Sequence, residues 1–286
     1  MPADLHIHTI FSDGTHTPEE IVEKALQSGL STIAISDHDA VEGIPRAEAA
    51  ARNAARGENG KSLEIIPAIE MNAETETNEV HVLGYFIDWE ANWFQILLKD
   101  LQMRRRRRIE GMVQKLKDLG LPIEVEQVFQ QASEKSVGRP HIARVLVEAG
   151  LVTSFQDAFN RYLAYGKPAY VKGDRLSVEE AIHAIKQAGG VPVLAHPGVY
   201  KPPLDVESVI PKGIEGIEIF YNEHDPEQQR RFKNLCNEHN LLMTGGSDFH
   251  GDNRPHRTLG SVQLDDTYVT LLKERQRKNA SKVLKG

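Results

Sequence analysis

Short runs rich in Ile, Val and Leu alternate with helical patterns along most of the chain. They predict strands over seven segments: Ala3–Thr9, Thr32–Ser36, Leu63–Glu70, Glu79–Phe86, Val191–Ala195, Gly216–Phe220 and Leu241–Gly245. A strand followed by a helix, repeated, is typical of a parallel α/β architecture. The first helix is well marked, because Thr17 suits an N-cap, Pro18 fits the first helical position and Glu20 completes a capping box before Gly29.

The strand signal disappears between about residues 91 and 174. Helical patterns run there through Trp93–Leu119, Glu124–Ala132, Pro140–Ala149 and Ser154–Leu163. Strand and helix alternation resumes at Ser177–Gly189. We therefore expect one discontinuous domain, residues 1–90 and 175–286, interrupted by an all-helical insertion over residues 91–174 that caps it. The last segment, Asp265–Gly286, is polar and basic, and we expect it to fray.

Composition and charge exclude several classes of protein. The 286 residues include 34 basic and 41 acidic side chains, and the net charge of −7 disfavours a general polyanion-binding surface but not a local basic pocket. One cysteine, Cys236, excludes an intramolecular disulfide and a cysteine zinc cluster, and fits a reducing compartment. No apolar run approaches the roughly 18 residues that span a bilayer, and no signal-peptide core follows Met1. We therefore expect a cytoplasmic location.

Two histidines lie two residues apart in the first predicted strand. In His6-Ile7-His8 both imidazoles project to one side, because successive strand residues point to opposite faces. Leu5 and Ile7 would pack on the other side. This arrangement brings two nitrogen ligands to one point, although an isolated His-x-His is more often a satisfied surface or core pair than a metal site.

Residues of the metal-ligand type recur at or near the ends of six of the seven predicted strands. They are His6, His8, His38, Glu70, His81, His196, Asp248 and His250. In parallel α/β folds the carboxyl ends of the strands gather on one face, where catalytic sites form. Buried histidines scattered at random would not select these positions, so we expect the residues to converge on one metal-binding site.

The motifs around these residues resemble those of the polymerase and histidinol phosphatase (PHP) metallophosphoesterases. They are Asp4-Leu5-His6-Ile7-His8-Thr9, Ser12-Asp13-Gly14, Ser36-Asp37-His38-Asp39, Ala195-His196-Pro197 and Ser247-Asp248-Phe249-His250. The resemblance covers Asp4–Asn92 and roughly Ser177–Gly260. It implies an α/β fold, a distorted (β/α)7 PHP barrel here interrupted by the helical insertion, and three bound divalent metal ions.

The resemblance also implies which residues hold each metal. One set is His6, His8, Glu70 and Asp248, the second is Glu70, His81 and His196, and the third is Asp13, His38 and His250. Mixed imidazole and carboxylate ligands suit manganese, and also iron or zinc. Such ions make bound water nucleophilic near neutral pH and stabilise phosphoryl oxygens. We therefore expect a phosphoric ester hydrolase in which Asp13, His38 and His196 take part in catalysis.

The insertion indicates a closer resemblance to a PHP subgroup of nucleoside 3′,5′-bisphosphate phosphatases and 5′ to 3′ exoribonucleases. The matching features are Arg105 and Arg108 on the first helix of the insertion and the segment Gly138–Arg144. Arg105 and Arg108 are three residues apart, so on a helix they share a face and can bind phosphate oxygens. The neighbouring Arg104, Arg106 and Arg107 would point elsewhere. The resemblance implies hydrolysis of a nucleoside 3′,5′-bisphosphate to the 5′-monophosphate, and leaves open 5′ to 3′ trimming of short RNA.

Further residues are candidates for contact with the substrate. Arg139 and His141 lie where a helix begins, and its free amides attract anions, although Arg139 could instead pair with a carboxylate of the insertion. His224 follows a predicted strand and could protonate the leaving group, or be a surface-loop histidine. Tyr170 could stack on a base, or belong to a packed linker.

Three other functions fit the sequence less well. A histidinol-phosphate-type monophosphatase would not need an arginine-bearing cap, and a noncatalytic PHP module would have lost ligands, whereas all nine matched positions are filled. An amidohydrolase uses similar ligand types, but the phosphate-directed arginines argue against it. We expect a phosphorylated nucleotide or short RNA end as the partner, with no membrane and no obligate protein partner.

Overall fold

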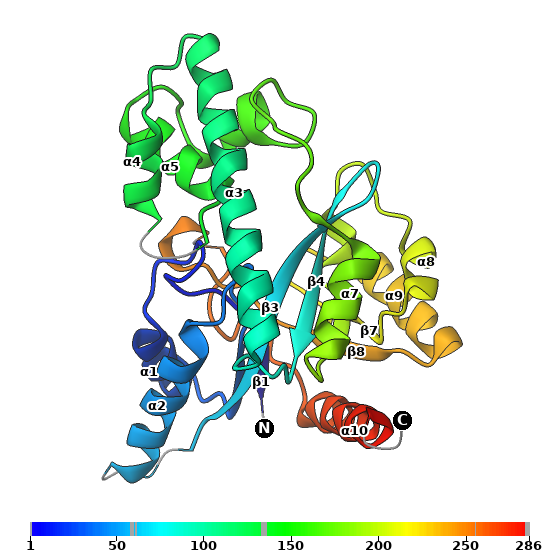
Figure 1. Cartoon of the computed structure of the whole chain (residues 1–286). Helices are drawn as coiled ribbons and strands as arrows, with labels where there is room; N and C mark the ends of the chain where they lie inside the picture. Colours follow the sequence, from blue (N-terminus) through cyan, green and yellow to red (C-terminus); the bar gives the residue numbers. More distant parts are fainter. Residues whose placement is uncertain (1, 58–59, 61, 133–135, 255, 284–286) are drawn as a thin grey trace.

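The computed structural model describes residues 2–57, 60, 62–132, 136–254 and 256–283 (Figure 1). Its strands are β1 (Ala3–Ile7), β2 (Thr32–Ile35), β3 (Glu64–Glu74), β4 (Glu79–Tyr85), β5 (Leu176–Ser177), β6 (Val191–Leu194), β7 (Gly216–Phe220) and β8 (Leu242–Gly245). They form one sheet in the order β1-β2-β3-β4-β6-β7-β8, with the two-residue β5 beside β3. All seven predicted strands are therefore present, and β5 is an addition.

The helices follow the strands as the alternation predicted, and the capping box at Thr17 and Glu20 is confirmed. The helices are α1 (Pro18–Gln27), α2 (Gly43–Arg56), α3 (Asn92–Asp118), α4 (Val125–Gln131), α5 (Arg139–Glu148), α6 (Phe155–Ala158), α7 (Val178–Gln187), α8 (Val206–Val209), α9 (Pro226–His239) and α10 (Asp266–Val283). Short turns complete the set: the π-helical η1 (Phe159–Leu163) and the 3-10 turns η2 (Pro197–Val199), η3 (Ile210–Lys212) and η4 (Gly251–Asn253). No helix among the described residues is long and apolar enough to cross a membrane.

The sheet is not parallel throughout, and the expectation is wrong at β4. This strand runs antiparallel to both β3 and β6. The pairing with β3 extends from Ala68↔Tyr85 to Glu74↔Glu79, so the two strands form a hairpin and no crossover helix is needed. Glu70 therefore lies inside a long strand rather than at its end. Because β4 is reversed, His81 near its beginning lies at the same end of the sheet as the carboxyl ends of the parallel strands.

The curved sheet brings its two edges together. Ile7 in β1 forms an isolated parallel bridge with Phe249, just after β8, and Ala3 forms an antiparallel one with Leu264. Asp4 is fully buried between them, and its carboxylate accepts hydrogen bonds from the backbone N–H groups of Ser247 and Gly260, each at 2.9 Å. The predicted fold class, a distorted barrel with a helical insertion, is confirmed.

Helix α3 connects two separate hydrophobic cores. Its first half places Phe94, Leu98 and Leu101 in the core of the barrel. Its second half, from Ile109 to Leu116, packs in a core made only of residues between 109 and 169. Figure 1 shows α3 running beside the barrel and rising above it to meet α4 and α5. The insertion thus has its own core and stands over the end of the sheet where His81 lies. We call it the cap.

The C-terminal segment does not fray as the sequence predicted. Helix α10 covers Asp266–Val283, and residues 284–286 lie outside the described part of the chain. Val269 and Leu272 are fully buried against the third hydrophobic cluster, which also contains Leu5, Ala34 and Val193. Val269 and Leu272 are three residues apart, so they share the face of α10 that packs on the barrel.

Candidate metal centre

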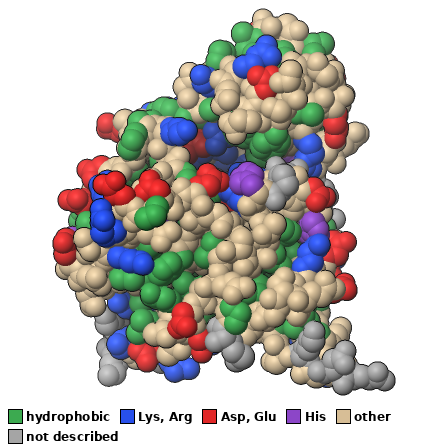
Figure 2. All heavy atoms as spheres, turned by 180° about the vertical axis from the view of Figure 1, so that it is seen from behind, with side chains coloured by type: hydrophobic (Ala, Val, Ile, Leu, Met, Phe, Trp, Pro, Cys, Tyr) green, Lys and Arg blue, Asp and Glu red, His purple; other side chains and the backbone are tan. Residues whose placement is uncertain are grey.

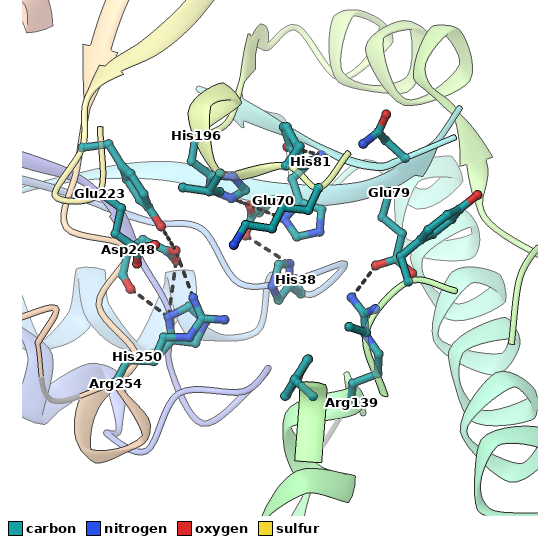
Figure 3. A pocket seen from close by; sticks show the side chains of 18 of the residues that line it. His38, Glu70, Glu79, His81, Arg139, His196, Glu223, Asp248, His250 and Arg254 are labelled. Carbon is teal, nitrogen blue, oxygen red and sulfur yellow. Dashed lines mark hydrogen bonds and ion pairs between the residues drawn. The ribbon is translucent and has the colours of Figure 1, made fainter. Parts of the chain in front are cut away.

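The residues with metal-ligand side chains gather at the end of the barrel beneath the cap. His6 comes from β1 and His8 follows it, while Glu70 and His81 come from β3 and β4. The remaining members follow the ends of strands: Asp13, His38, His196, Asp248 and His250. All nine are buried except His81, which is half-buried. Figure 3 shows Glu70 at the centre of this group, with His38, His81 and His196 around it.

Four of these residues form a tight first cluster. Nε2 of His6 lies 3.1 Å from Nε2 of His8, so the two imidazoles point at one position, as the His-x-His pattern predicted. Oε2 of Glu70 lies 3.2 Å from Nε2 of His6 and 3.1 Å from that of His8. Oδ1 of Asp248 lies 3.1 Å from Nε2 of His8. Two nitrogen and two oxygen atoms therefore surround a small space of the size that a cation fills.

Two more clusters overlap with the first. One contains His8, Asp13, His38 and His250, and the other contains His38, Glu70 and His81. The expected second set had His196 in place of His38. Nε2 of His196 lies 3.1 Å from Oε1 of Glu70, and Nδ1 of His81 lies 2.8 Å from the same oxygen. Glu70 thus adjoins both groups of histidines, which is the position of a carboxylate that bridges two cations.

Unsatisfied polar atoms show that this centre suits cations. Oε2 of Glu70, Oδ1 of Asp248 and Nε2 of His250 are buried and have no hydrogen-bond partner in the described structure. Buried carboxylate oxygens without hydrogen bonds are costly, because burial removes their hydration. Divalent metal ions would satisfy these atoms, so the residues present fit the metals that the sequence implies.

Backbone strain accompanies the ligands. His196 has a φ of +31° and Asp248 a φ of +51°, in the left-handed region that side chains other than glycine rarely adopt. Asp39, next to His38, has a φ of +49°. Each of these residues follows the end of a strand. The strained turn there directs the metal-ligand side chain that it carries, or that of the adjacent residue, towards the metal centre. Strain of this kind persists where the surrounding structure enforces it, and it concentrates at functional sites.

Carboxylates raise the proton affinity of the first two histidines. Burial alone would lower the pKa of His6, but Glu218, Glu70 and Asp248 together raise it well above its usual 6.5. Burial likewise opposes the charged form of His8, yet the adjacent carboxylates of Asp248 and Glu70 raise its pKa to about 9. Protons therefore occupy these imidazoles at neutral pH when no metal is bound. A cation must displace them.

Glu218 is a buried residue of β7 that the sequence reasoning missed. Its Oε1 lies 3.0 Å from Nδ1 of His6, and its Oε2 accepts a 2.8 Å hydrogen bond from the backbone N–H of His196. It therefore orients one imidazole and fixes the strained turn that carries another. A lone acidic residue inside the apolar strand Gly216–Phe220 was the available signal.

A basic loop after β8 supports Asp248 and was also missed. The guanidinium of Arg257 pairs with Oδ2 of Asp248 and with Glu223, and Arg254 approaches the same Oδ2 at 3.3 Å. The hydroxyl of Tyr221 donates to Oδ2 at 3.0 Å. These contacts occupy one carboxylate oxygen and leave Oδ1 for the metal centre. Figure 3 shows Arg254 beside Asp248 and Glu223 at the edge of the cavity. No hydrophobic periodicity marks this loop.

Arginines from the cap line a second, smaller cavity of about 70 Å³ next to the centre. Arg105 and Arg108 both face it, as their spacing predicted, and Arg139, Arg175 and Arg254 share its lining with Asp13, His38 and His81. Arg105 is held by Asp39 at 2.7 Å and by the carbonyl of Val137 at 3.0 Å. Figure 2 shows Lys, Arg and His side chains at the surface where the narrower upper part of the molecule meets the barrel.

Arg108 differs from its neighbours because it forms no ion pair with any carboxylate that the structure describes. It is 7% exposed, and among the described residues no carboxylate or hydrogen-bond acceptor contacts its guanidinium. Burial lowers its pKa to about 9, the positive charges of Arg175 and Arg105 contribute in the same direction, and the more distant charge of Glu79 opposes them only in part. A buried cation without a counterion destabilises a folded protein. An anion bound beside Arg108 would therefore stabilise the protein.

Arg139 pairs with a carboxylate, as one alternative predicted, but the carboxylate belongs to the barrel rather than the insertion. Glu79 in β4 forms ion pairs with both Arg139 and Arg175. Burial would raise the pKa of Glu79, yet the two arginines lower it to about 2. Arg139 still lines both cavities, and Figure 3 shows it reaching Glu79 across from the histidines. Arg175 follows the insertion and was not predicted.

His141, predicted to bind substrate, and His224, predicted to protonate the leaving group, make hydrogen bonds to the backbone. Nδ1 of His141 accepts the backbone N–H of Gly138 at 3.0 Å and so caps α5, and burial lowers its pKa to about 4. His224 donates from Nδ1 to the carbonyl of Ile219 at 2.9 Å, and its Nε2 accepts the N–H of Gly198 at 3.0 Å. Neither residue lines either cavity in the described structure. Backbone groups thus hold Nδ1 of His141 and both ring nitrogens of His224.

Comparisons with known proteins agree with this geometry. The PHP domain model matches residues 4–102. The 5′-3′ exoribonuclease Rnm of Escherichia coli is 34% identical over 253 residues, which are 86% of this chain and 84% of that protein. The 3′,5′-nucleoside bisphosphate phosphatase of Chromobacterium violaceum is 31% identical over 269 residues, 91% of each.

A solved structure from Bifidobacterium adolescentis, described as a metal-dependent phosphoesterase, aligns with a TM-score of 0.85 and 34% identity. The alignment covers 94% of both chains. The family resemblance seen in the motifs is thereby confirmed across barrel and cap. The chain belongs to the PHP domain family of metal-dependent phosphoesterases.

Proposed function

We propose that this enzyme hydrolyses the 3′-phosphate ester of a nucleoside 3′,5′-bisphosphate, giving the nucleoside 5′-monophosphate and phosphate. The observation that carries the proposal is Arg108, a buried cation that forms no ion pair with a described carboxylate and lies in a small cavity that borders the metal centre. A substrate with two phosphates places one on the metal centre and the other against this guanidinium. The relatives named as a bisphosphate phosphatase and as an exoribonuclease support a nucleotide or an RNA 5′ end.

We also propose that three divalent ions occupy the centre, and manganese is the first candidate, with iron or zinc as alternatives. His6, His8, Glu70 and Asp248 would hold one ion. Asp13, His38 and His250 would hold another, and Glu70 with His81 and His196 the third. When bound, such ions supply Lewis acidity and activate water for attack on phosphorus. The free, buried Cys236 supports a cytoplasmic location. Manganese and iron are both present in that compartment.

The side chains of the chain itself perform the remaining tasks. Glu218 and Tyr221 orient His6 and Asp248, so that their donor atoms converge before substrate arrives. Arg108 neutralises the second phosphate, with Arg105 and Arg139 beside it. Fixing both phosphates orients the ester oxygen that leaves, which lowers the entropy cost of reaching the transition state. Because backbone groups hold both nitrogens of His224, we assign it to the support of β7 rather than to proton transfer.

The test compares phosphate release from adenosine 3′,5′-bisphosphate and from adenosine 3′-monophosphate by manganese-loaded enzyme. We expect the bisphosphate to be preferred, and Arg108→Met to reduce that preference at least tenfold. Arg107→Met is the matched control, because Arg107 is 61% exposed and pairs with Asp174 outside the cavity. An unchanged preference in Arg108→Met would refute the role of the cap. A 5′-phosphorylated RNA oligonucleotide assayed in parallel shows whether trimming accompanies phosphatase activity.

A further inference from the structure

Strands β4 and β6 depart from regular sheet pairing at the point where they present two metal-ligand residues. The strands run antiparallel, with Leu83 opposite Val193, and the same register places His81 opposite Ala195, the residue before His196. Opposite residues that are hydrogen-bonded to each other normally exchange two backbone bonds. In the described structure His81 and Ala195 exchange one, from the N–H of Ala195 to the carbonyl of His81 at 3.1 Å.

The hydroxyl of Tyr200 takes the place of the second bond. It accepts the backbone N–H of His81 at 2.9 Å and donates to the carbonyl of Ala195 at 3.1 Å. A hydroxyl group is therefore inserted between two backbone groups that would otherwise bond each other directly. The two strands open at this point, and the side chain of Tyr200 fixes how far they open.

The peptide unit between Ala195 and His196 is held at both of its polar groups. Its carbonyl accepts the hydroxyl of Tyr200, and its N–H donates to Oε2 of Glu218 at 2.8 Å. These two contacts fix the orientation of the peptide plane that precedes His196, whose φ is +31°. Strain of this kind persists only where the surrounding structure enforces it. Tyr200 and Glu218 are side chains that enforce it here.

Tyr200 is itself held in place by its ring and by the loop that carries it. The centre of its ring lies 5.5 Å from that of His196 and 6.5 Å from that of His81. Two residues further on, the carbonyl of Pro202 accepts a hydrogen bond from Nδ2 of Asn78 at 2.6 Å. Asn78 is buried and directly precedes β4, so the loop is anchored to the strand that carries His81.

The hydroxyl of Tyr200 is engaged with the sheet rather than with the space above it. Tyr200 is half-buried and lines the cavity of about 340 Å³ above the metal centre. A phenol at such a place could donate a hydrogen bond to a substrate. However, it has one proton to donate, and the carbonyl of Ala195 accepts it. The geometry therefore favours a role in the placement of the neighbouring histidines.

We propose that Tyr200 is a positioning residue for one metal ion, because its hydroxyl sets the separation between His81 and His196. The proposal rests on the proposed function, in which these two histidines and Glu70 hold that ion. Nδ1 of His81 and Nε2 of His196 lie 2.8 and 3.1 Å from the same oxygen, Oε1 of Glu70. A change in the spacing of the two strands would move one imidazole away from it. The other two sets of ligands contain neither histidine, so their ions should be unaffected.

Tyr200→Phe removes the hydroxyl and keeps the ring. We expect calorimetric titration of the metal-free protein with manganese to show two ions bound as in the wild type and one bound about 10- to 100-fold more weakly. This is the usual effect of losing a residue that orients a metal ligand. Tyr162→Phe is the control, since the hydroxyl of Tyr162 accepts a hydrogen bond from Arg161 in the cap. Unchanged affinity for all three ions, or an equal loss for all three, would overturn the proposal.

A double-mutant cycle separates failure of the positioning role from failure of the proposed function. His81→Ala removes a ligand directly, so Tyr200→Phe should have no further effect on manganese binding in that background, whereas its effect should add to that of His250→Ala. Manganese binding that His81→Ala leaves unchanged would show that the ion itself is absent, and the proposal would fall with it. A loss in His81→Ala that Tyr200→Phe does not share would overturn the positioning role alone. Neither measurement needs turnover, so both are independent of which phosphate ester is hydrolysed.

Discussion

Oε1 of Glu218 lies 3.0 Å from Nδ1 of His6, and both residues are fully buried. Since an ionised carboxylate only accepts hydrogen bonds, Nδ1 carries the proton and Nε2 faces the other ligands. A metal-binding histidine is commonly fixed by a carboxylate in this way. Glu218 therefore decides which nitrogen of His6 is available to a cation.

Glu218→Gln should weaken manganese binding about 10- to 100-fold, because an amide orients the imidazole less strongly and lacks the negative charge. Titration calorimetry of the metal-free protein measures the affinity without any assay of activity. Glu48→Gln is a suitable control, as Glu48 pairs with Arg52 on the outside of α2. Unchanged manganese affinity in a folded Glu218→Gln protein would show that His6 is oriented without the carboxylate.

Metal binding should release protons at pH 7. The pKa of His8 is raised to about 9 in the metal-free protein, and that of His6 is also raised well above 6.5, so both imidazoles hold protons that a cation displaces. Manganese affinity should then increase with pH between 6 and 9. Titrations in two buffers with different ionisation enthalpies give the number of protons released. A value near zero at pH 7 would contradict the high proton affinity of this pair.

Arg108→Met should raise the melting temperature of the ligand-free protein by a few degrees. The guanidinium is buried and forms no ion pair with a described carboxylate, and at this chain length about 1 kcal/mol corresponds to roughly 2–4 °C. Inorganic phosphate should stabilise the metal-free wild type and have a smaller effect on the variant. Differential scanning calorimetry with and without phosphate, beside Arg107→Met, measures both effects. Loss of stability in Arg108→Met would mean that a structural partner compensates the charge.

The ion pairs of Glu79 should give the cap junction an acid-sensitive contribution to stability. Its pKa is about 2 in the folded protein and 4.5 when unperturbed, so the contribution is complete above pH 4.5 and disappears as pH falls towards 2. The shift corresponds to roughly 3 kcal/mol. The difference in unfolding free energy between wild type and Glu79→Gln should therefore shrink between pH 5 and pH 3. A difference that stays constant over this range would show that Arg139 and Arg175 do not control the carboxylate.

Leu272→Ala should destabilise the protein by about 2–5 kcal/mol, the usual cost of emptying a buried leucine site. Leu272 is fully buried beneath the barrel, whereas its neighbour Leu271 is 45% exposed. Leu271→Ala is thus a control at the adjacent position and should change stability by less than about 0.5 kcal/mol. Urea unfolding of the two variants decides whether α10 is part of the fold. Equal stability of the two would mean that it is not.

Local patterns predicted most of the architecture, and their failures have physical causes. Strand periodicity located the seven longer strands, and helical patterns located α1, α3 and α7, because burial of one face imposes that period. The reversed direction of β4 was missed because a hairpin and a crossover leave the same apolar run, and only the short turn between β3 and β4 distinguishes them. Helix α10 was missed because Val269 and Leu272 are few among polar neighbours.

In the candidate site, too, local sequence patterns predicted some residues and missed others. The histidines and carboxylates were identifiable because they recur at strand ends. Glu218 and Arg257 act through neighbours that only the folded sheet brings near them, 212 residues apart in sequence in the case of Glu218 and His6. The spacing of Arg105 and Arg108 predicted their shared face, whereas nothing local indicated that one would be paired and the other not.

The course of α3 through both hydrophobic cores sets how the enzyme can select a substrate. A continuous helix bends only gently, and this one is anchored in the barrel by Phe94 and in the cap by Met112. Arg105 and Arg108 lie on the stretch between these anchors, so their distance from the histidines is almost constant. The enzyme could then select a ligand by the distance between its two phosphates. Under the proposed function, a molecule with two phosphates at a different spacing would be rejected because of its length rather than its chemistry.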